Sequence, residues 1–314
     1  MKPSSNPQPL VISLGEVLWD LFPAGPSFGG APANFACHAV SLGARVSIVS
    51  AVGQDAYGRQ AREILTSLGV DTALLQDVAN LPTGAVAVSL DSAGKPVFAI
   101  TKGAAWDNIA WSDSLAASIP TANMLYFGTL AQREAVTRGT IRRALAVAVE
   151  AGVPRVLDVN LRPPFFDHTM IRESVNLCSI LKLSDDELPT VTAACEIQTM
   201  AGVEASLRAL LERYDLAVIA LTRGANGTLL LSRHEMIDQP GIPTKVCDTV
   251  GAGDSFTAAL VTGLLAGKPL ADIARHACQT AAFVCSQPGA VPQSSSNIMA
   301  SGRENPPIGS VSDP

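Results

Sequence analysis

Short apolar runs alternate with stretches of helical periodicity along most of the chain. The run LVISL is followed by ANFACHAVSLG, whose apolar residues recur with helical spacing, and RVSIVSAVG is followed by YGRQAREILTSLG. The alternation continues through MLYFG, RVLDVN, CSILKLS and LAVIALTRG. Strands that alternate with helical crossovers form parallel sheets covered by helices. The sequence therefore predicts an α/β fold around a central, mainly parallel sheet.

Two stretches interrupt this alternation. EVLWDLFPAGPSFGG and TGAVAVSLDSAGKPVFAITKGAAWDNI have the character of antiparallel strands, and the second carries a D-S-A-G turn. We expect lid strands from about 16–30 and 84–108 to form a small sheet that projects from the main one. A flap of this kind beside a rigid sheet commonly excludes water from a reaction. Trp106 and Asp107 either end this flap beside a ligand site or cap a helix with a packed indole.

The length and composition favour one folded domain over residues 10–292. Residues 1–9 and 293–314 are polar, rich in Pro and Ser and without periodicity, so both are predicted to be loose tails. With 47% apolar and 16% charged residues, the chain is not disordered, and its formal net charge of −6 offers no basic patch for nucleic acid. The expected partner is a small molecule.

The cysteines and the chain start indicate a cytoplasmic protein. The six cysteines have neither C-x-x-C nor zinc spacing, and they are typical of buried thiols in a reducing compartment. The opening MKPSSNPQP lacks the apolar segment of a signal peptide, and no apolar run reaches the roughly 18 residues of a membrane span. We therefore expect no membrane partner.

The segment DTVGAGDSF, residues 248–256, places an acid where an anion is expected. A Gly-Ala-Gly turn that opens a helix leaves backbone N–H groups pointing outward, which favours binding of an anion such as phosphate. A carboxylate at Asp254 is a poor neighbour for phosphate unless it has a task, and accepting a proton from an attacking hydroxyl is such a task. The simpler alternative is that Asp254 caps the helix.

Four segments in this order resemble the ribokinase-like, or PfkB-type, carbohydrate kinases. In chain order they are GGAPANFACHAVSLGARVSIVSAVGQDAYG, the PTG before the predicted flap, LTRGANG and DTVGAGDSF. Within that family, LGEVLWDLF, DVNLRPPFF and KLSDDEL are most similar to the fructokinase branch. The resemblance covers about residues 10–292. It implies transfer of the γ-phosphate of ATP to a sugar hydroxymethyl group, with a small β-sheet lid beside the site.

The resemblance implies that Asp254 is the catalytic base and that the N–H groups of Gly251, Ala252 and Gly253 form an anion hole. A helix N-terminus stabilises a carboxylate and so weakens it as a base. Phosphoryl transfer passes through a loose transition state, however, so proton removal can come late. Most of the rate would then come from holding the hydroxyl in line and stabilising charge on the phosphoryl oxygens.

The sugar-binding residues implied by the resemblance are Asp20, Gly30, Asn34, Phe98 and Arg162. An ionised Asp20 can accept hydrogen bonds from two adjacent hydroxyls. Asn34 could instead cap a helix, Phe98 could belong to the core of the flap, and Arg162 could form a buried ion pair with Asp158. One departure concerns the substrate, since Ala31 stands where ribokinases carry Lys. This change favours a substrate other than ribose.

The implied nucleotide-binding residues lie in three segments. LTRGANG supplies Thr222, Gly224 and Gly227 at a junction where backbone can approach phosphates, and AFVCSQPGA supplies Gly289. In KLSDDEL, Ser184 and Glu187 either form a capping box or place the Glu near Mg²⁺ and phosphate.

The expected cofactors are therefore ATP and Mg²⁺. The resemblance also admits K⁺ at Asp248, and a homodimer formed through the lid.

Other functions stay open at this level. Within the class, the acceptor could be 2-keto-3-deoxygluconate, another sugar or a nucleoside in place of fructose, because single polar contacts decide specificity. A non-catalytic sugar sensor could keep the fold, although it has no need of an acid beside the phosphate. A dinucleotide-binding dehydrogenase is excluded, because SLGEVLWD lacks the G-x-G-x-x-G that should follow the first strand.

Overall fold

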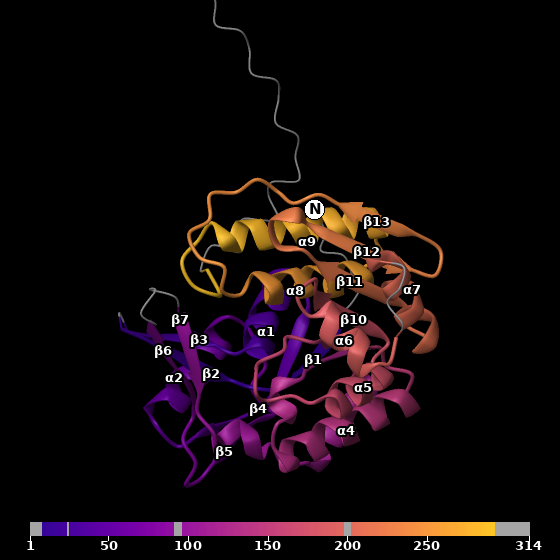
Figure 1. Ribbon diagram of the computed structural model, residues 1–314. Helices are drawn as coiled ribbons and strands as arrows, with labels where there is room; N and C mark the ends of the chain where they lie inside the picture. Colours follow the sequence, from indigo (N-terminus) through magenta and orange to yellow (C-terminus); the bar gives the residue numbers. More distant parts are fainter. Residues whose placement is uncertain (1–7, 24, 91–95, 198–201, 293–314) are drawn as a thin grey trace, which may run out of the picture.

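A large mixed sheet forms the centre of the protein, and a small sheet projects from one side of it (Figure 1). The computed structural model describes residues 8–23, 25–90, 96–197 and 202–292. In spatial order the main sheet consists of β13 (Met236–Gln239), β12 (Thr228–Ser232), β11 (Val218–Thr222), β10 (Ile180–Ser184), β9 (Arg155–Asp158), β8 (Met124–Gly128), β1 (Leu10–Leu14), β4 (Arg45–Gly53) and β5 (Leu75–Val78). In the described sheet, neighbouring strands from β11 to β5 are parallel. The pairs β11–β12 and β12–β13 are antiparallel. The predicted α/β class is confirmed.

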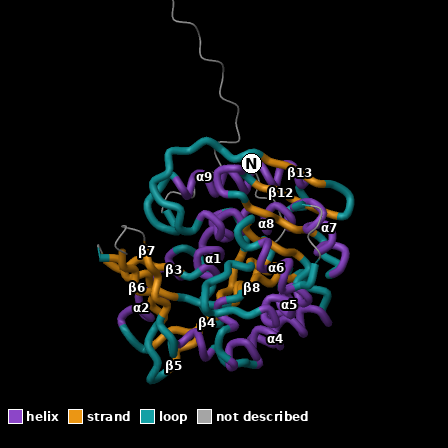
Figure 2. Tube along the Cα trace, viewed as in Figure 1, coloured by secondary structure: helices purple, strands orange, loops and turns teal. Residues whose placement is uncertain are grey.

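Helices cover both faces of this sheet (Figure 2). They are α1 (Ala31–Ser41), α2 (Ala56–Ser67), α3 (Asp113–Ser118), α4 (Ala135–Glu150), α5 (His168–Leu177), α6 (Leu188–Ala194), α7 (Val203–Arg213), α8 (Ala252–Leu265) and α9 (Leu270–Cys285). One core cluster contains the buried residues of α3 to α7, and the other contains those of α1, α2, α8 and α9. The sheet is therefore the middle of three layers.

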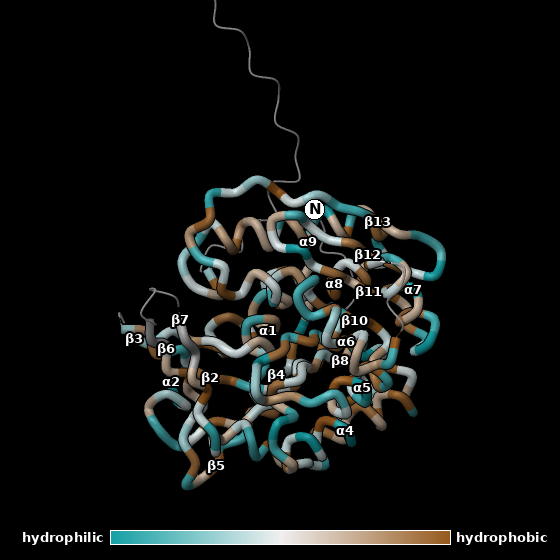
Figure 3. Tube along the Cα trace, in the orientation of Figure 1, coloured by the Kyte–Doolittle hydropathy of each residue, from teal (hydrophilic) through white to brown (hydrophobic). Residues whose placement is uncertain are grey.

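The strands are apolar throughout because both faces are buried. In β1, Ile12 and Leu14 belong to one core cluster, whereas Val11 belongs to the other. Hydrophobic colours accordingly concentrate in the central strands, and hydrophilic colours lie mostly in the outer loops (Figure 3). This burial on both faces explains why the sequence shows continuous apolar runs instead of strict alternation.

The strand order reverses at β1. After β1 the chain adds β4 and β5 on one side, and it then returns to place β8 on the other side. Ligands of open parallel sheets bind at the carboxyl ends of strands, near such a reversal. Asp158, Ser184 and Thr222 end β9, β10 and β11 at this edge. The fold thus brings three separate segments to one crevice.

Helix α8 packs closely against its neighbours because its sequence is rich in small residues. Ala258 and Ala259 are fully buried, and a methyl group on Gly263 would lie 2.8 Å from a side-chain carbon of Ile273 on α9. Close packing against α1 and α9 fixes the axis of α8. It therefore fixes the direction in which the first turn of α8 points.

The small sheet has the order β3 (Gly25–Gly29), β2 (Leu18–Phe22), β6 (Gly84–Leu90) and β7 (Pro96–Ile100). Each hairpin is antiparallel, as the sequence predicts, but β2 pairs with β6 in parallel. This pairing differs from the purely antiparallel expectation. The predicted sugar contact Phe98 lies in β7, and its side chain is outside the described part of the structure.

Trp106 and Asp107 help to hold the segment that follows β7. The indole of Trp106 is fully buried, and Asp107 accepts a hydrogen bond from the Ala104 N–H at 3.0 Å, which caps a short 3-10 helix at Ala105–Asn108. Asp107 also accepts two hydrogen bonds from Arg133, at 2.7 and 2.8 Å. The Arg133 guanidinium lies over the Trp106 ring, 3.9 Å from its centroid. Of the two expectations for these residues, the structure shows a helix cap with a packed indole. It also shows an ion pair between Asp107 and Arg133 that the sequence did not predict.

We expect Arg133→Met to lower the free energy of unfolding by about 3–5 kcal/mol, because it leaves the Asp107 carboxylate buried without its partner. Both side chains are 2% exposed. The matched control is Arg208→Met, whose partner Glu204 is 51% exposed, and it should cost only about 0.3–0.5 kcal/mol. The difference is measured from urea unfolding curves. Equal losses in the two variants would contradict the role of the buried pair.

Candidate active site

The first turn of α8 begins at a glycine that no other residue can replace without strain. Gly251 caps the helix with a φ of 79°, in the left-handed region. A methyl group there would lie 2.4 Å from the carbonyl oxygen of Ala290. The first N–H groups of a helix lack intrahelical partners and favour anions. Two members of the predicted anion hole lie inside α8, Ala252 as its first residue and Gly253 as its second. The Ala252 N–H also donates a long hydrogen bond of 3.3 Å to the Thr249 carbonyl.

Asp254 is the third residue of this turn, and its carboxylate meets a residue from the opposite end of the chain. The Asn34 side-chain amide donates a hydrogen bond of 2.8 Å to Asp254 Oδ2. Asn34 lies in the first turn of α1 and is 4% exposed. Burial raises the pKa of Asp254, while the Asn34 hydrogen bond and the charges of Lys182 and Arg162 act to lower it. The result is a carboxylate held in one orientation and more basic than usual.

The predicted sugar residues Asp20 and Arg162 lie within range of charge interaction with Asp254. The pKa of Asp20 is raised to about 6, chiefly by burial; the Arg162 charge opposes this rise and the Asp254 charge adds to it. Asp20 lies on β2 of the small sheet, and Arg162 is exposed in the loop after β9. Arg162 does not pair with Asp158, so that alternative is not what the structure shows. Gly30 joins β3 to α1 and lies against the backbone of Glu16.

Glu16 is a buried acid that the sequence analysis did not single out. It is 3% exposed, and its Oε2 has no hydrogen-bond partner among the described residues. Its pKa is raised to about 7, chiefly by burial; the Asp254 charge adds to this rise and the Arg162 charge opposes it. The acid is the second residue after β1, beside the crevice. Its position just beyond a buried strand end was the available signal.

Lys182 is the second residue that the sequence analysis missed. It lies within β10, is 6% exposed, and donates a hydrogen bond of 3.0 Å to Asp158 Oδ1. The Thr257 hydroxyl donates a hydrogen bond of 2.8 Å to Asp158 Oδ2. Burial raises the pKa of Asp158 to about 6 against the lowering effect of the Lys182 charge. A charged residue inside the apolar run ILKLS could have indicated a buried ion pair.

Ser184 and Glu187 form the reciprocal pair of a capping box. The Ser184 N–H donates to Glu187 Oε2 at 2.8 Å, and the Glu187 N–H donates to Ser184 Oγ at 3.3 Å. Glu187 Oε1 also accepts a hydrogen bond from the Leu161 N–H at 2.7 Å. Both carboxylate oxygens thus fix the loops around the crevice. A role for Glu187 near Mg²⁺ and phosphate stays a prediction.

The predicted nucleotide residues lie on the other side of the α8 N-terminus from the small sheet. Thr222 ends β11, and Gly224 and Gly227 have φ angles of 51° and 85° in the turn that follows. A methyl group on Gly227 would lie 2.0 Å from the Gln239 carbonyl oxygen, so the turn requires glycine there. Asp248 accepts hydrogen bonds from the N–H groups of Val250 at 3.0 Å and Gly289 at 3.2 Å. These bonds join the loop before α8 to the chain after α9.

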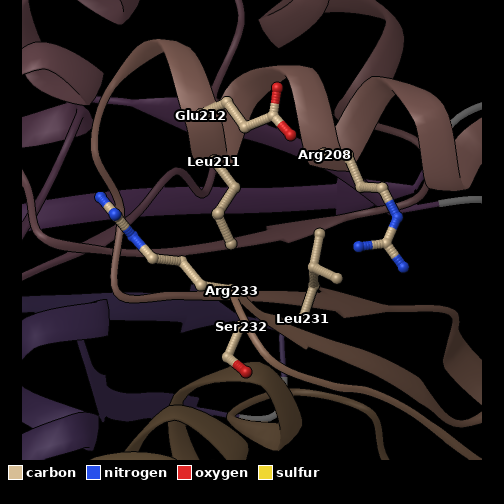
Figure 4. A pocket seen from close by; sticks show the side chains of 6 residues that line it. All are labelled: Arg208, Leu211, Glu212, Leu231, Ser232 and Arg233. Carbon is tan, nitrogen blue, oxygen red and sulfur yellow. The ribbon is translucent and has the colours of Figure 1, made fainter.

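A surface pocket between α7 and β12 is unrelated to these residues (Figure 4). Arg208 and Arg233 lie at opposite sides of it. Each guanidinium already has an acidic partner, Glu204 for Arg208 and Asp215 for Arg233. The two positive charges of the pocket are therefore already paired within the protein. Among the described residues, no helix is long and apolar enough to cross a membrane.

Comparison with known proteins defines the class. Residues 25–297 match the pfkB family of carbohydrate kinases, and since this match spans most of the chain, the protein belongs to that family and is a sugar kinase. Fructokinase-2 of Solanum habrochaites is 27% identical over 308 residues, which cover 90% of this chain and 92% of that protein. A putative sugar kinase of Pyrococcus horikoshii is 30% identical over 280 residues, with coverages of 83% and 84%.

Solved structures confirm the ribokinase-like fold. The fructokinase of Vibrio cholerae, crystallised with fructose, ADP and calcium ion, has a TM-score of 0.78 at 24% identity, over 91% of this chain and 96% of that one. A putative ribokinase II of E. coli has a TM-score of 0.81 at 20% identity, with coverages of 93% and 98%. The predicted family and fold are thus confirmed.

Gly251→Ala should destabilise the protein more than Gly267→Ala. Gly267 has a φ of 63° but nothing within 4 Å of an added methyl group, so alanine there costs only the left-handed strain of about 1–2 kcal/mol. At position 251 the backbone near Ala290 must also move. Thermal unfolding of the two variants measures the difference. Similar melting temperatures would show that the loop after α9 does not constrain the α8 turn.

Proposed function

We propose that the protein is a fructokinase, which transfers the γ-phosphate of ATP to a hydroxymethyl oxygen of fructose. The observation that carries this proposal is the Asp254 carboxylate, held by Asn34 at the N-terminus of α8 and within range of charge interaction with Asp20 and Arg162. The name of the Solanum relative and the fructose and ADP in the Vibrio crystal support the choice of sugar. An acidic crevice with hydrogen-bond acceptors suits a polyhydroxylated, uncharged acceptor.

The sugar is positioned by residues from two elements of the N-terminal half. Asp20 on β2 and Asn34 on α1 offer acceptors and a donor for neighbouring hydroxyls, and Gly30 lets the backbone approach closely. Arg162 lies opposite and binds a sugar oxygen or a phosphate oxygen. Phe98 would close over the sugar from β7. With the sugar held in this way, one hydroxymethyl oxygen points at Asp254.

Asp254 accepts the proton of that hydroxyl as the oxygen forms its bond to the γ-phosphorus, and the bond from phosphorus to the bridging oxygen breaks to release ADP. The raised pKa of Asp254 makes it a better proton acceptor than a solvent-exposed Asp. The N–H groups of Gly251, Ala252 and Gly253 would face the phosphoryl oxygens, where positive dipoles stabilise developing charge.

ATP fits the edge of the sheet beyond α8. A helix N-terminus suits the phosphates, and the glycine turn at Gly224 and Gly227 together with Thr222 and Gly289 would hold the nucleotide. Mg²⁺ bound with ATP neutralises charge on the phosphates. Glu187 and Ser184 would act on that ion through bridging water molecules. K⁺ at Asp248 and a homodimer through the small sheet stay predictions.

Asp254→Asn should lower kcat by about 10³-fold while leaving the affinity for fructose nearly unchanged, because the amide keeps the shape but accepts no proton. The matched control is Asp272→Asn, since Asp272 occupies the same third position in α9 and pairs with Arg275 on the surface. ADP release is measured with fructose, ribose, 2-keto-3-deoxygluconate, glucose and adenosine. The proposal would be contradicted if Asp272→Asn lost fructose turnover while Asp254→Asn kept it. Faster turnover of another acceptor than of fructose by the wild type would contradict the choice of sugar.

Asn34→Ala should move the acid limb of the kcat/KM profile to higher pH. The Asn34 hydrogen bond favours the ionised form of Asp254, so its removal raises the pKa of Asp254 further, and the base is then lost at a higher pH as acid is added. Asp20 and Glu16, with pKa values of about 6 and 7, titrate in the same range, so only the shift between variants is diagnostic. If the acid limb of Asn34→Ala stays at the wild-type pH, Asn34 does not influence the ionisation of Asp254.

A further inference from the structure

The ion pair of Lys182 and Asp158 lies directly beneath the first turn of α8. The Lys182 ammonium is 3.2 Å from the position that a methyl group on Gly253 would take. It is therefore in contact with the backbone at the second residue of the helix. Asp158 lies one turn further along, because its Oδ2 accepts the Thr257 hydroxyl at 2.8 Å. The two charges of the pair thus line up along α8.

The pair points in the same direction as the helix dipole. The N-terminus of a helix carries a partial positive charge. Lys182 adds its positive charge at that end, and Asp158 places its negative charge further from it. Because these groups are buried, solvent screens their field weakly. The pair therefore increases the positive potential at the N–H groups of the first turn.

Stability alone does not explain a buried lysine at this position. Desolvation of two buried charges commonly cancels their attraction, and apolar residues of similar size often stabilise a fold equally well. The neighbours of Lys182 in β10, Leu181 and Leu183, are fully buried. A third apolar side chain would suit such a strand. The charge is better explained by the field that it creates at α8.

We propose that Lys182 is a positioning residue for phosphoryl transfer, whose ammonium, oriented by Asp158, strengthens the anion hole at the N-terminus of α8 in the transition state. This inference rests on the proposed kinase function of the site. It assigns to the β10 lysine a part in the reaction that is separate from sugar binding. The charged groups that face Lys182 are Asp158, Glu187 and Asp254.

The test compares Lys182→Met with the double variant Lys182→Met/Asp158→Asn. Met keeps the length of the side chain without its charge, and the second change removes the buried carboxylate that would otherwise lack a partner. If Lys182 only neutralises Asp158, the double variant recovers wild-type behaviour. If Lys182 acts on the phosphoryl group, both variants stay impaired. Urea unfolding of each variant shows whether the fold has survived.

The main readout is the gain in ADP affinity that aluminium fluoride produces, measured by calorimetry with Mg²⁺ and D-fructose present. Aluminium fluoride beside ADP imitates the transferring phosphoryl group, so this gain reports on the transition state, whereas ADP alone reports on the ground state. We expect both variants to bind ADP alone with the affinity of the wild type. The increase in ADP affinity that aluminium fluoride produces should be about 10–100-fold smaller in the variants than in the wild type. Their kcat for fructose should fall by about 10²-fold, the effect of removing one donor of an anion hole.

The outcomes separate this inference from the proposed function. Wild-type protein that phosphorylates no sugar in the panel overturns the proposed function. Wild-type turnover together with an undiminished aluminium fluoride gain in Lys182→Met overturns the role of Lys182, as does full recovery in the double variant. Lys182→Arg offers a further check, because a retained charge should keep part of the gain.

Discussion

One carboxyl group, that of Asp158, fixes the first turn of α8 to the edge of the main sheet. It accepts hydrogen bonds from Lys182 on β10 and from Thr257 on α8, and it ends β9 itself. Three elements thus meet at a group that is 1% exposed. Because Thr257 lies one turn beyond Gly253, this contact anchors the first turn at the edge of the sheet, while packing against α1 and α9 fixes its direction. The position of Asp254 depends on it.

The crevice gathers four acids whose pKa values are raised, and burial is what makes Asp254 more basic than an exposed Asp. Glu16, Asp20, Asp158 and Asp254 all have raised pKa values, and burial is the largest cause in each case. The Asp254 charge raises the pKa of Glu16, Asp20 and Asp158, so the ionisation of these three acids depends on Asp254. The charges of Lys182 and Arg162 act in the opposite direction on Asp254 itself.

The fold and the first turn of α8 could be predicted because their signals are local. Apolar runs predict buried strands, and the G-A-G-D segment contains both the glycine that takes a φ of 79° and the acid of the first turn. Contacts between distant segments have no such signal. The pairs of Lys182 with Asp158 and of Arg133 with Asp107 join residues 24 and 26 positions apart. Nothing in the sequence indicates which partner each charge has, which is why Arg162 was a competing partner for Asp158.

The hydrogen bond between Asn34 and Asp254 joins residues 220 positions apart. In the proposed function, Asn34 lies on the sugar side with Asp20 of the small sheet, whereas Asp254 lies on the helix whose N-terminus would face the phosphates. A sugar that contacts Asn34 would therefore change the environment of the base at the same time. In the proposed function, one amide group would then couple proton acceptance to binding of the sugar, because the Asn34 hydrogen bond holds Asp254 and favours its ionised form.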